Sequence, residues 1–305
     1  MEFDKQHYVR SPLFYVGNKH KLLPQLALLF PREVNRLIEP FVGGGSVFMN
    51  TRSEIVIAND IDKNLIDIHR FLIENCNDIE GLLRRMTTLA QKFQLSCSHK
   101  GEVIDSKIRE DFPKTYFAHS NRSGYKKLKD KYNSSTKRDA LELYLLVIYG
   151  FNRMLRFNRS GEFNIPVGNV DFNSNVVEAL RNYSDRIKNR NITFSSKDFG
   201  SFLDDIKFQP KDFVYVDPPY LITSSEYNKG WTEESENRLY GLLDRLDTQK
   251  IRFAVSNVVK YENQTNTILE AWMSKYQVHD ISSNYINYFS NGKKNIKEVL
   301  VCNYV

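Results

Sequence analysis

Asp217, Pro218, Pro219 and Tyr220 form the run of the sequence that is richest in chemistry. A proline has no N–H to donate and holds its φ angle fixed, so its carbonyl remains as a rigid acceptor. A carboxylate, a proline carbonyl and an aromatic ring in one tight turn suit the activation of an exocyclic amine on a planar base. Asp217 and the Pro218 carbonyl can accept the two amine protons and favour the pyramidal amine with an available lone pair, while Tyr220 can stack on a flipped base. The alternative is structural: the prolines end a strand and Asp217 caps a turn.

A second run is a glycine turn that combines an aromatic residue, three glycines and a hydroxyl: Phe41, Gly43, Gly44, Gly45 and Ser46. Such a turn lets a ligand approach the backbone closely, and the helix that follows offers amide donors. Asp60 follows the next apolar run and is placed to bind a ribose diol, as in dinucleotide folds. The GxGxxG pattern fails, however, because Phe48 stands at its last position. A plain turn, and a helix-capping role for Asp60, remain the alternatives.

The elements expected around these runs have the rhythm of a parallel α/β sheet. Helices are expected over residues 46–51, 64–74 and 233–246. Short apolar strands are expected over residues 36–41, 54–58, 191–195, 213–216, 251–256 and 298–302. The glycine turn follows the first of these strands, and Asp217 directly follows the strand over 213–216.

The middle of the chain, residues 76–190, loses this rhythm. Helices are expected over residues 80–93 and 140–148, whereas residues 96–133 are polar and basic and predict loops. Residues 150–173 predict loops and a hairpin. Between residues 100 and 190 there are 18 Lys and Arg against 11 Asp and Glu, a balance of +7, which leaves −1 for the rest of a chain of net charge +6. A solvated surface is the alternative, but this concentration favours a polyanionic partner.

Composition excludes several classes of protein. With 305 residues, 41% of them hydrophobic, the chain can build a real core, and wholesale disorder is excluded. No apolar stretch approaches the length of a bilayer span, and no signal-like start opens the chain, so a cytosolic, non-membrane protein is expected. The three cysteines, Cys76, Cys97 and Cys302, predict neither a disulfide framework nor a zinc site, and no metal is expected. None of them follows a proline, which excludes cytosine-C5 methylation through a cysteine nucleophile.

Taken together, the motifs resemble those of the S-adenosylmethionine-dependent adenine-N6 DNA methyltransferases of the Dam family (D12 class), whose enzymes methylate adenine in GATC. The resemblance is scattered over most of the chain, at residues 15–19, 39–46, 58–60, 150–158, 161–168 and 217–223. It implies a Rossmann-like α/β methyltransferase sheet with helices on both faces. The implied catalytic domain comprises residues 1–75 and 191–305, and a mainly helical DNA-recognition domain with a β-hairpin comprises residues 76–190.

The resemblance also implies roles for individual residues. The catalytic motif is Asp217, Pro218, Pro219 and Tyr220. The residues implied for S-adenosylmethionine are Tyr15 and Lys19 in the pocket, Phe41, Gly43, Gly45 and Ser46 around the methionine end, Asp60 at the ribose, and Asp198 and Phe199 at the adenine.

In the insert, the resemblance assigns contacts with double-stranded DNA. Phe151 matches the aromatic residue that enters the base stack, and Asn152 lies where backbone contacts are made. Arg156 matches the arginine that reads a guanine edge, which suits a bidentate contact with O6 and N7. Met154 and Pro166 match apolar positions that touch the central bases. The sequence departs from the family pattern at Val170, where an aromatic residue often fills the gap left by the flipped base.

The leading hypothesis is therefore base flipping and direct methyl transfer to adenine N6, within GATC. A cognate restriction endonuclease is a candidate functional partner. The alternatives are another DNA motif, an RNA adenine or protein amide as acceptor, and a non-catalytic DNA-binding protein that keeps the methyltransferase fold.

Overall fold

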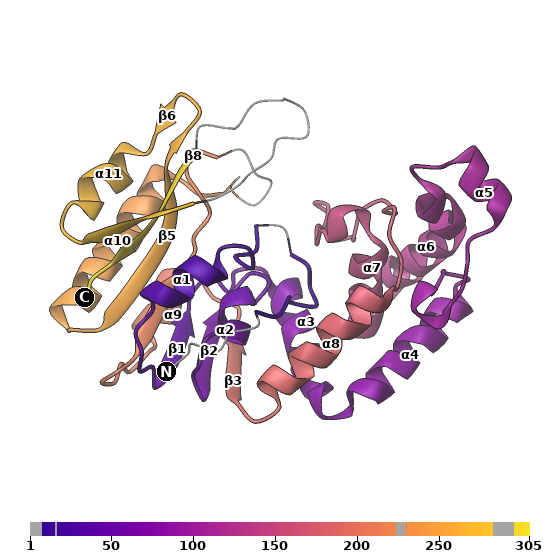
Figure 1. The fold of residues 1–305 in the computed structure, drawn as a ribbon, viewed down its shortest axis with the longest axis horizontal. Coiled ribbons are helices and arrows are strands. Elements are labelled where there is room, and N and C mark those ends of the chain that lie inside the picture. Colours follow the sequence, from indigo (N-terminus) through magenta and orange to yellow (C-terminus); the bar gives the residue numbers. More distant parts are fainter. Residues whose placement is uncertain (1–7, 16, 224–227, 229, 283–295) are drawn as a thin grey trace. The chain divides into compact units, whose positions relative to one another are not determined.

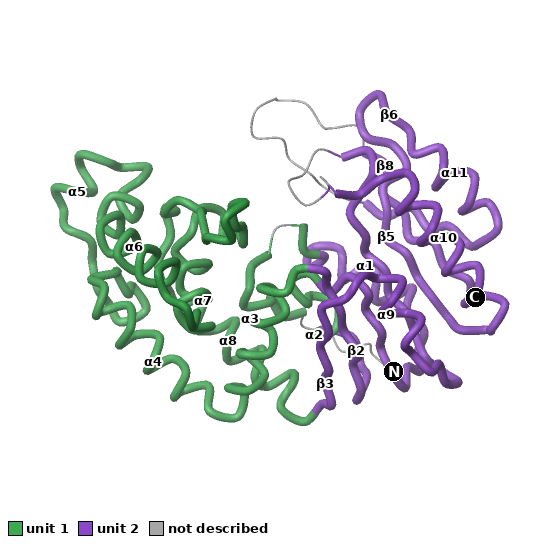
Figure 2. Tube along the Cα trace, turned by 180° about the vertical axis from the view of Figure 1, so that it is seen from behind, with its two compact units in different colours: residues 1–18, 43–49, 62–189 green, residues 19–42, 50–61, 190–305 purple. Residues whose placement is uncertain are grey.

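The computed structural model describes residues 8–15, 17–223, 228, 230–282 and 296–305. The chain divides into two compact units (Figure 2). Residues 1–18, 43–49 and 62–189 form what we call the helical unit, and residues 19–42, 50–61 and 190–305 form the sheet unit. These bounds place the glycine turn and helix α3 (Lys63–Glu74) with the helical unit. Helix α3 packs there against α7 (Ala140–Tyr149), with the rings of Phe71 and Tyr144 6.5 Å apart.

The sheet unit is built on one sheet in which the described strands have the order β3-β2-β1-β4-β5-β8-β7 (Figure 1). The first five run parallel: β3 (Asn191–Ser195), β2 (Ile55–Asn59), β1 (Arg36–Glu39), β4 (Phe213–Val216) and β5 (Arg252–Tyr261). Strand β8 (Ile296–Cys302) is antiparallel to both β5 and β7 (Gln277–Ile281). The short β6 (Gln264–Thr265) pairs with the end of β5.

Both faces of the central strands are covered. The four residues of β4 are all buried, as expected for a parallel strand between two layers. Val214 and Val216 belong to a core formed with α9 (Phe199–Asp204), α10 (Glu233–Thr248) and α11 (Thr267–Met273). On the other face the ring of Phe30, which follows α1 (Leu23–Leu29), lies 5.1 Å from that of Phe213 and 5.3 Å from that of Tyr215. The strand therefore ends rigidly at Val216, and Asp217 comes next.

All the strands and helices that the sequence predicts are present, and most have ends shifted by a few residues. The strands over residues 191–195 and 213–216 have the predicted bounds. Strand β1 stops at Glu39 rather than at residue 41, since Pro40 cannot donate a ladder hydrogen bond. The mostly parallel α/β sheet is thus confirmed.

The helical unit is formed mainly by α3, α7 and four further helices: α4 (Ile79–Lys92), α5 (Ser106–Asp111), α6 (Tyr116–Ser134) and α8 (Ser174–Ile187). The short α2 (Ser46–Asn50) follows the glycine turn. Three single turns complete the unit: η1 (Cys76–Asp78), η2 (Ser98–Lys100) and η3 (Phe151–Arg153). Helix α7 is its core, with every residue from Glu142 to Tyr149 buried.

The prediction of loops over residues 96–133 is wrong, because this stretch contains α5 and most of the 19-residue α6. Helix α6 buries one narrow stripe at helical spacing: Asn121, Gly124, Tyr125, Leu128 and Tyr132. The lysines between these residues give the sequence its polar character but lie outside the stripe. At Gly124 an added Cβ would lie 2.0 Å from the carbonyl oxygen of Phe93, so the glycine permits a close approach of the backbone.

Within the described part of the chain, no helix is both long and apolar enough to cross a membrane. In the same residues, no group of three His, Cys, Asp or Glu side chains is placed to hold a metal ion. All three cysteines are buried and unbridged, and burial raises the pKa of the Cys97 thiol to about 11.

Candidate active site

The end of β4 carries the catalytic candidate. Lys19, whose backbone carbonyl accepts the first hydrogen bonds of α1, places its Nζ 2.7 Å from both carboxylate oxygens of Asp217. The Tyr220 hydroxyl lies 3.1 Å from Asp217 Oδ1, and Lys19 Nζ lies over the Tyr220 ring, 5.0 Å from its centroid. The fold thus brings together three of the predicted site residues from two distant parts of the sequence.

A residue that the sequence analysis missed completes this cluster. Glu298 on β8 accepts a hydrogen bond from the Tyr220 hydroxyl at 3.1 Å, and its Oε1 lies 4.0 Å from Lys19 Nζ. The side chains of Glu298 and Lys19 are 1% and 5% exposed, whereas that of Asp217 is 20% exposed. Asp217 is therefore the member of the cluster that presents an acceptor to a ligand.

Tyr215, two residues before Asp217, places a buried polar group near the cluster. Its hydroxyl lies 2.8 Å from the Ser256 Oγ on β5. Burial, together with the negative charge of Asp217, raises the pKa of Tyr215 well above its ordinary value, although the hydrogen bond between the Tyr215 and Ser256 hydroxyls acts in the opposite direction. Tyr215 therefore remains a neutral phenol and cannot act as a general base.

Next to the ends of β1 and β3, three aromatic rings of the sheet unit form a cluster. The ring of Phe41 lies 5.3 Å from that of Phe199 and 5.6 Å from that of Trp231, and the rings of Phe199 and Trp231 are 5.5 Å apart. Trp231 donates its indole N–H to the fully buried Glu236. The rings of Phe41 and Phe199, two of the residues implied for the cofactor, are thus in contact, and both pack on Trp231, which was not singled out from the sequence.

Asp198 has structural partners in this part of the unit. Its carboxylate accepts the backbone N–H groups of Gly200, at 3.0 Å, and Ser201, at 3.3 Å, at the start of α9. It also pairs with Arg238, which lies over the Phe199 ring at 4.5 Å. Partial burial opposes ionisation, but Arg238 and the two amides outweigh it and lower the pKa of Asp198. Its role at the cofactor adenine stays a prediction.

Asn59, at the end of β2, forms hydrogen bonds with residues at the ends of the neighbouring strands β1 and β3. Its side-chain N–H groups donate to the carbonyls of Pro40, at 3.1 Å, and Lys197, at 2.9 Å. Its Oδ1 accepts from Ser195 Oγ and from the Lys197 N–H. The cap of helix α3 is made by Asp62, which accepts from the Asn64 and Leu65 amides. The capping role considered for Asp60 therefore belongs to Asp62.

The glycine turn belongs to the helical unit and is sterically specified. Gly43 and Gly45 have φ values of 47° and 75°, in the left-handed region that favours glycine. A Cβ on Gly44 would lie 2.6 Å from the Cβ of Tyr15, so Tyr15 packs directly on the turn, while its role in a cofactor pocket stays a prediction. His69 Nε2 lies 2.8 Å from the Gly43 carbonyl and holds the turn from α3. Ser46 is buried at the start of α2.

The candidate DNA-contacting residues lie at one surface of the helical unit. Phe151 is 50% exposed, which excludes a core role. Asn152 and Arg156 are exposed, Met154 is half-buried, and Pro166 is exposed and accepts the Phe151 N–H at 2.9 Å. Antiparallel bridges join Gly150 to Val167 and Phe157 to Phe163, so this segment folds back on itself as a hairpin.

The neighbouring arginines differ in environment. Arg156 donates from Nε to Asn164 Oδ1 at 2.9 Å, at the exposed side of the hairpin. Arg153 instead stacks its guanidinium 3.8 Å from the centroid of the Phe14 ring, and burial lowers its pKa. Of these two, Arg156 is the one that faces solvent.

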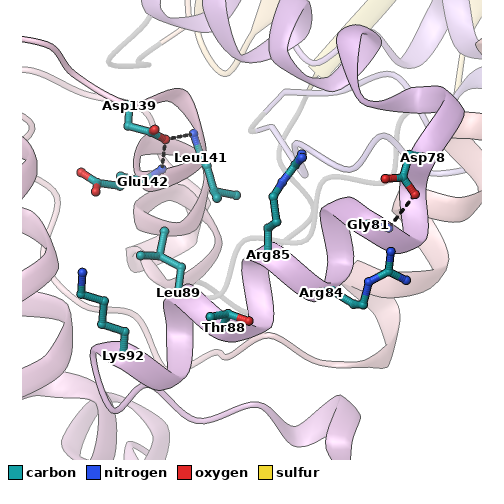
Figure 3. A pocket seen from close by; sticks show the side chains of 10 residues that line it. All are labelled: Asp78, Gly81, Arg84, Arg85, Thr88, Leu89, Lys92, Asp139, Leu141 and Glu142. Carbon is teal, nitrogen blue, oxygen red and sulfur yellow. Dashed lines mark hydrogen bonds between the residues drawn. The ribbon is translucent and has the colours of Figure 1, made fainter.

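One cavity of about 570 Å³ lies in the helical unit, between α4 and the start of α7 (Figure 3). Two of its acidic groups already serve as helix caps: Asp78 accepts the Gly81 N–H, and Asp139 accepts those of Leu141 and Glu142. Glu142 pairs with Lys131. These acidic groups are engaged within the protein, and none of the predicted site residues lines the cavity.

The mostly parallel sheet, with acidic and aromatic residues at its strand ends, is the α/β architecture that the sequence analysis expected of a methyltransferase. The sequence profile of the D12 class N6 adenine-specific DNA methyltransferases matches residues 15–286, and the chain belongs to this family.

Some known proteins similar to this chain are named as type II or modification methylases, and others as DNA adenine methylases. It is 30% identical over 306 residues to the type II methyltransferase M.FokI of Planomicrobium okeanokoites and 32% identical over 308 residues to the modification methylase StsI of Streptococcus sanguinis. Each alignment covers 97% of this chain but 43% of the relative, so the chain spans less than half the length of these proteins. It is also 30% identical over 224 residues to a DNA adenine methylase of Haemophilus influenzae, covering 72% of this chain and 66% of that protein.

Proposed function

We propose that this protein transfers a methyl group from S-adenosylmethionine to N6 of adenine in duplex DNA. The observation that carries the proposal is the Asp217 carboxylate at the end of β4, partly exposed and held at 2.7 Å by Lys19. Membership of the D12 class family supports the adenine-N6 chemistry.

Asp217 and Pro218 are the residues that act on the amine. The Asp217 carboxylate and the Pro218 carbonyl accept hydrogen bonds from its two N–H groups and turn its lone pair out of conjugation with the base. S-adenosylmethionine, when bound, supplies an electrophilic methyl group on a sulfonium. Asp217 then holds the proton that the methylated amine gives up. Because Lys19 lies over one face of the Tyr220 ring, the flipped adenine stacks on the other face.

The residues present fit an S-adenosylmethionine site. Phe41, Phe199 and Trp231 form an aromatic cluster suited to a planar adenine. Asp60, which does not cap α3, is suited to the ribose hydroxyls. The glycine turn with Gly43, Gly45 and Ser46, the Tyr15 ring packed on it and the Lys19 side chain complete the set expected from the sequence, with Asp198 at the adenine.

We further propose that the insert over residues 76–190 recognises DNA. The exposed Phe151 enters the base stack, Asn152 contacts the backbone, and Met154 and Pro166 touch the central bases. Arg156 uses Nε for Asn164, so its two terminal nitrogens would address guanine O6 and N7. The target proposed from the family resemblance is GATC. The type II and modification methylases among the relatives favour a cognate restriction endonuclease as functional partner.

The deciding experiment is methyl transfer from labelled S-adenosylmethionine to a DNA library, with modified positions read by sequencing. N6-methyladenine confined to GATC is the expected result. N6-methyladenine at another motif would keep the chemistry and overturn the assignment of Arg156 and its neighbours. Cofactor binding without any DNA methylation would favour an RNA or protein acceptor, or a catalytically silent DNA-binding protein.

A further inference from the structure

Glu298 is a buried carboxylate in β8, where it follows Lys297 and precedes four buried apolar residues. It lies in β8, with β5 on one side and β7 on the other, where it is opposite Val258 and Ile281. The pairing register of β5 and β8 shifts between Val258 and Lys260, immediately beside Glu298. Such bulges re-aim side chains and are common next to active sites. Because Val258 pairs with Glu298 and Lys260 pairs with Lys297, the extra residue lies in β5, and the irregularity adjoins the buried carboxylate.

Burying a carboxylate is costly unless the group is paired and hydrogen-bonded. The partners of Glu298 explain why it is there: the Tyr220 hydroxyl at 3.1 Å and Lys19 Nζ at 4.0 Å both address the same oxygen, Oε1. Both partners belong to the catalytic cluster. A residue that only stabilised the sheet would not need a hydrogen bond to Tyr220, which lies 78 residues earlier in the chain.

The Tyr220 hydroxyl has a single proton but two carboxylate acceptors, because Asp217 Oδ1 also lies at 3.1 Å. A hydroxyl that donates to Asp217 competes with a substrate amine for the same acceptor. A hydroxyl that donates to Glu298 leaves Asp217 available and still fixes the plane of the ring.

The geometry points to Glu298 as a positioning residue for methyl transfer, which draws the Tyr220 hydroxyl away from Asp217 so that Asp217 can accept the substrate amine. Glu298 acts through Tyr220 and does not touch the substrate. This inference rests on the proposed function, since it needs Asp217 and Tyr220 as the catalytic motif.

Two substitutions of similar length test the acceptor role. Glu298→Gln keeps an oxygen at the position of Oε1, and Glu298→Met keeps the volume without an acceptor. We expect Glu298→Met to lower kcat by about 10- to 100-fold, in the range found for residues that orient a functional group by hydrogen bonds, with KM for cofactor and DNA nearly unchanged. We expect Glu298→Gln to restore kcat to within about threefold of wild type, since neutral hydrogen bonds suffice for orientation.

The double variant Tyr220→Phe/Glu298→Met gives the sharper test, because it removes the competing donor. Its kcat should be no lower than that of Glu298→Met alone, an epistasis that a structural role would not produce. If Glu298→Met does not fold, Glu298→Asp decides instead. The shorter chain withdraws the acceptor while keeping the charge, and it should lower kcat about 10-fold by the same argument.

The matched control is Asp212→Asn, at the other end of β4. Asp212 is also a buried carboxylate, paired with Arg36 at 2.6 Å. Asp212→Asn should lower stability and leave kcat unchanged. Wild-type kcat in Glu298→Met, or a further fall on adding Tyr220→Phe, would overturn the inference, whereas an inactive wild-type protein would instead overturn the proposed function.

Discussion

Lys19 and Asp217, 198 residues apart in the sequence, form an ion pair in which Nζ lies 2.7 Å from both carboxylate oxygens. Lys19 is buried, whereas Asp217 remains partly open to solvent. The pair therefore ties the segment before α1 to the end of β4 and fixes the orientation of the carboxylate that the proposed chemistry uses.

Lys19→Met should lower both activity and stability. We expect a loss of about 1–3 kcal/mol in the free energy of unfolding, as for a buried hydrogen-bonding group that loses its partner, together with at least a tenfold fall in kcat because Asp217 loses its orientation. Urea unfolding and methyl-transfer kinetics measure the two effects. The control is Lys211→Met, whose exposed pair with Glu33 should contribute little to stability. Equal effects of the two substitutions would contradict the assignment.

Asp217→Ala should abolish turnover and leave DNA binding largely intact. In the proposed mechanism Asp217 stabilises the reacting amine, and removal of such a group costs on the order of 10²–10³ in rate or more. Methyl transfer and DNA binding are measured on the same preparation. Loss of folding or of DNA binding would show that Asp217 is structural.

Arg156→Ala should relax the choice of base at one position of the DNA site. A bidentate guanine contact contributes about 1–3 kcal/mol of discrimination. Competition binding with single-base variants of the site measures it, and Arg159→Ala, at an exposed neighbour, is the control. Equal weakening on every sequence would mean that Arg156 contacts phosphate alone.

His69 should make the protein acid-sensitive in a defined window. Complete burial, against a hydrogen bond to the Gly43 carbonyl, lowers its pKa from 6.5 to about 4. The unfolded chain therefore binds a proton between these values that the folded chain does not, and stability falls as the pH drops from about 6.5 toward 4. The full difference corresponds to about 3 kcal/mol. His69→Gln should flatten this part of the stability profile, whereas His119→Gln, at an exposed histidine, should leave it unchanged.

Trp231 should report cofactor binding. The chain contains two tryptophans, so Trp272→Phe leaves Trp231 as the single reporter. Since Trp231 packs on Phe41 and Phe199, saturating S-adenosylmethionine should change its emission, with a midpoint that matches the binding constant measured by calorimetry. Trp231→Phe, which keeps Trp272, should show no such change. A silent Trp231 would place the cofactor adenine elsewhere.

Local patterns determined much of this protein. The apolar run over residues 213–216 predicted a buried strand, and the Asp-Pro-Pro-Tyr turn at its end predicted an amine-activating site, because periodicity and turn chemistry act over a few residues. The glycine turn was equally visible, since left-handed backbone angles require glycine at Gly43 and Gly45. Family motifs then indicated the activity.

Only the tertiary structure showed which distant residues contact the Asp-Pro-Pro-Tyr motif and the aromatic cluster. Glu298 in β8 carries no local signal. It stands next to Lys297, and the sequence does not show which of these two charged side chains faces the interior until the partner strands are placed. The contact of Trp231 with the Phe41 ring, and the hydrogen bond from its indole N–H to the buried Glu236, are likewise visible only in the folded chain. The sequence analysis missed helix α6 because its buried stripe is narrow and is surrounded by lysines. Each of these depends on contacts between distant segments, which the order of residues does not display.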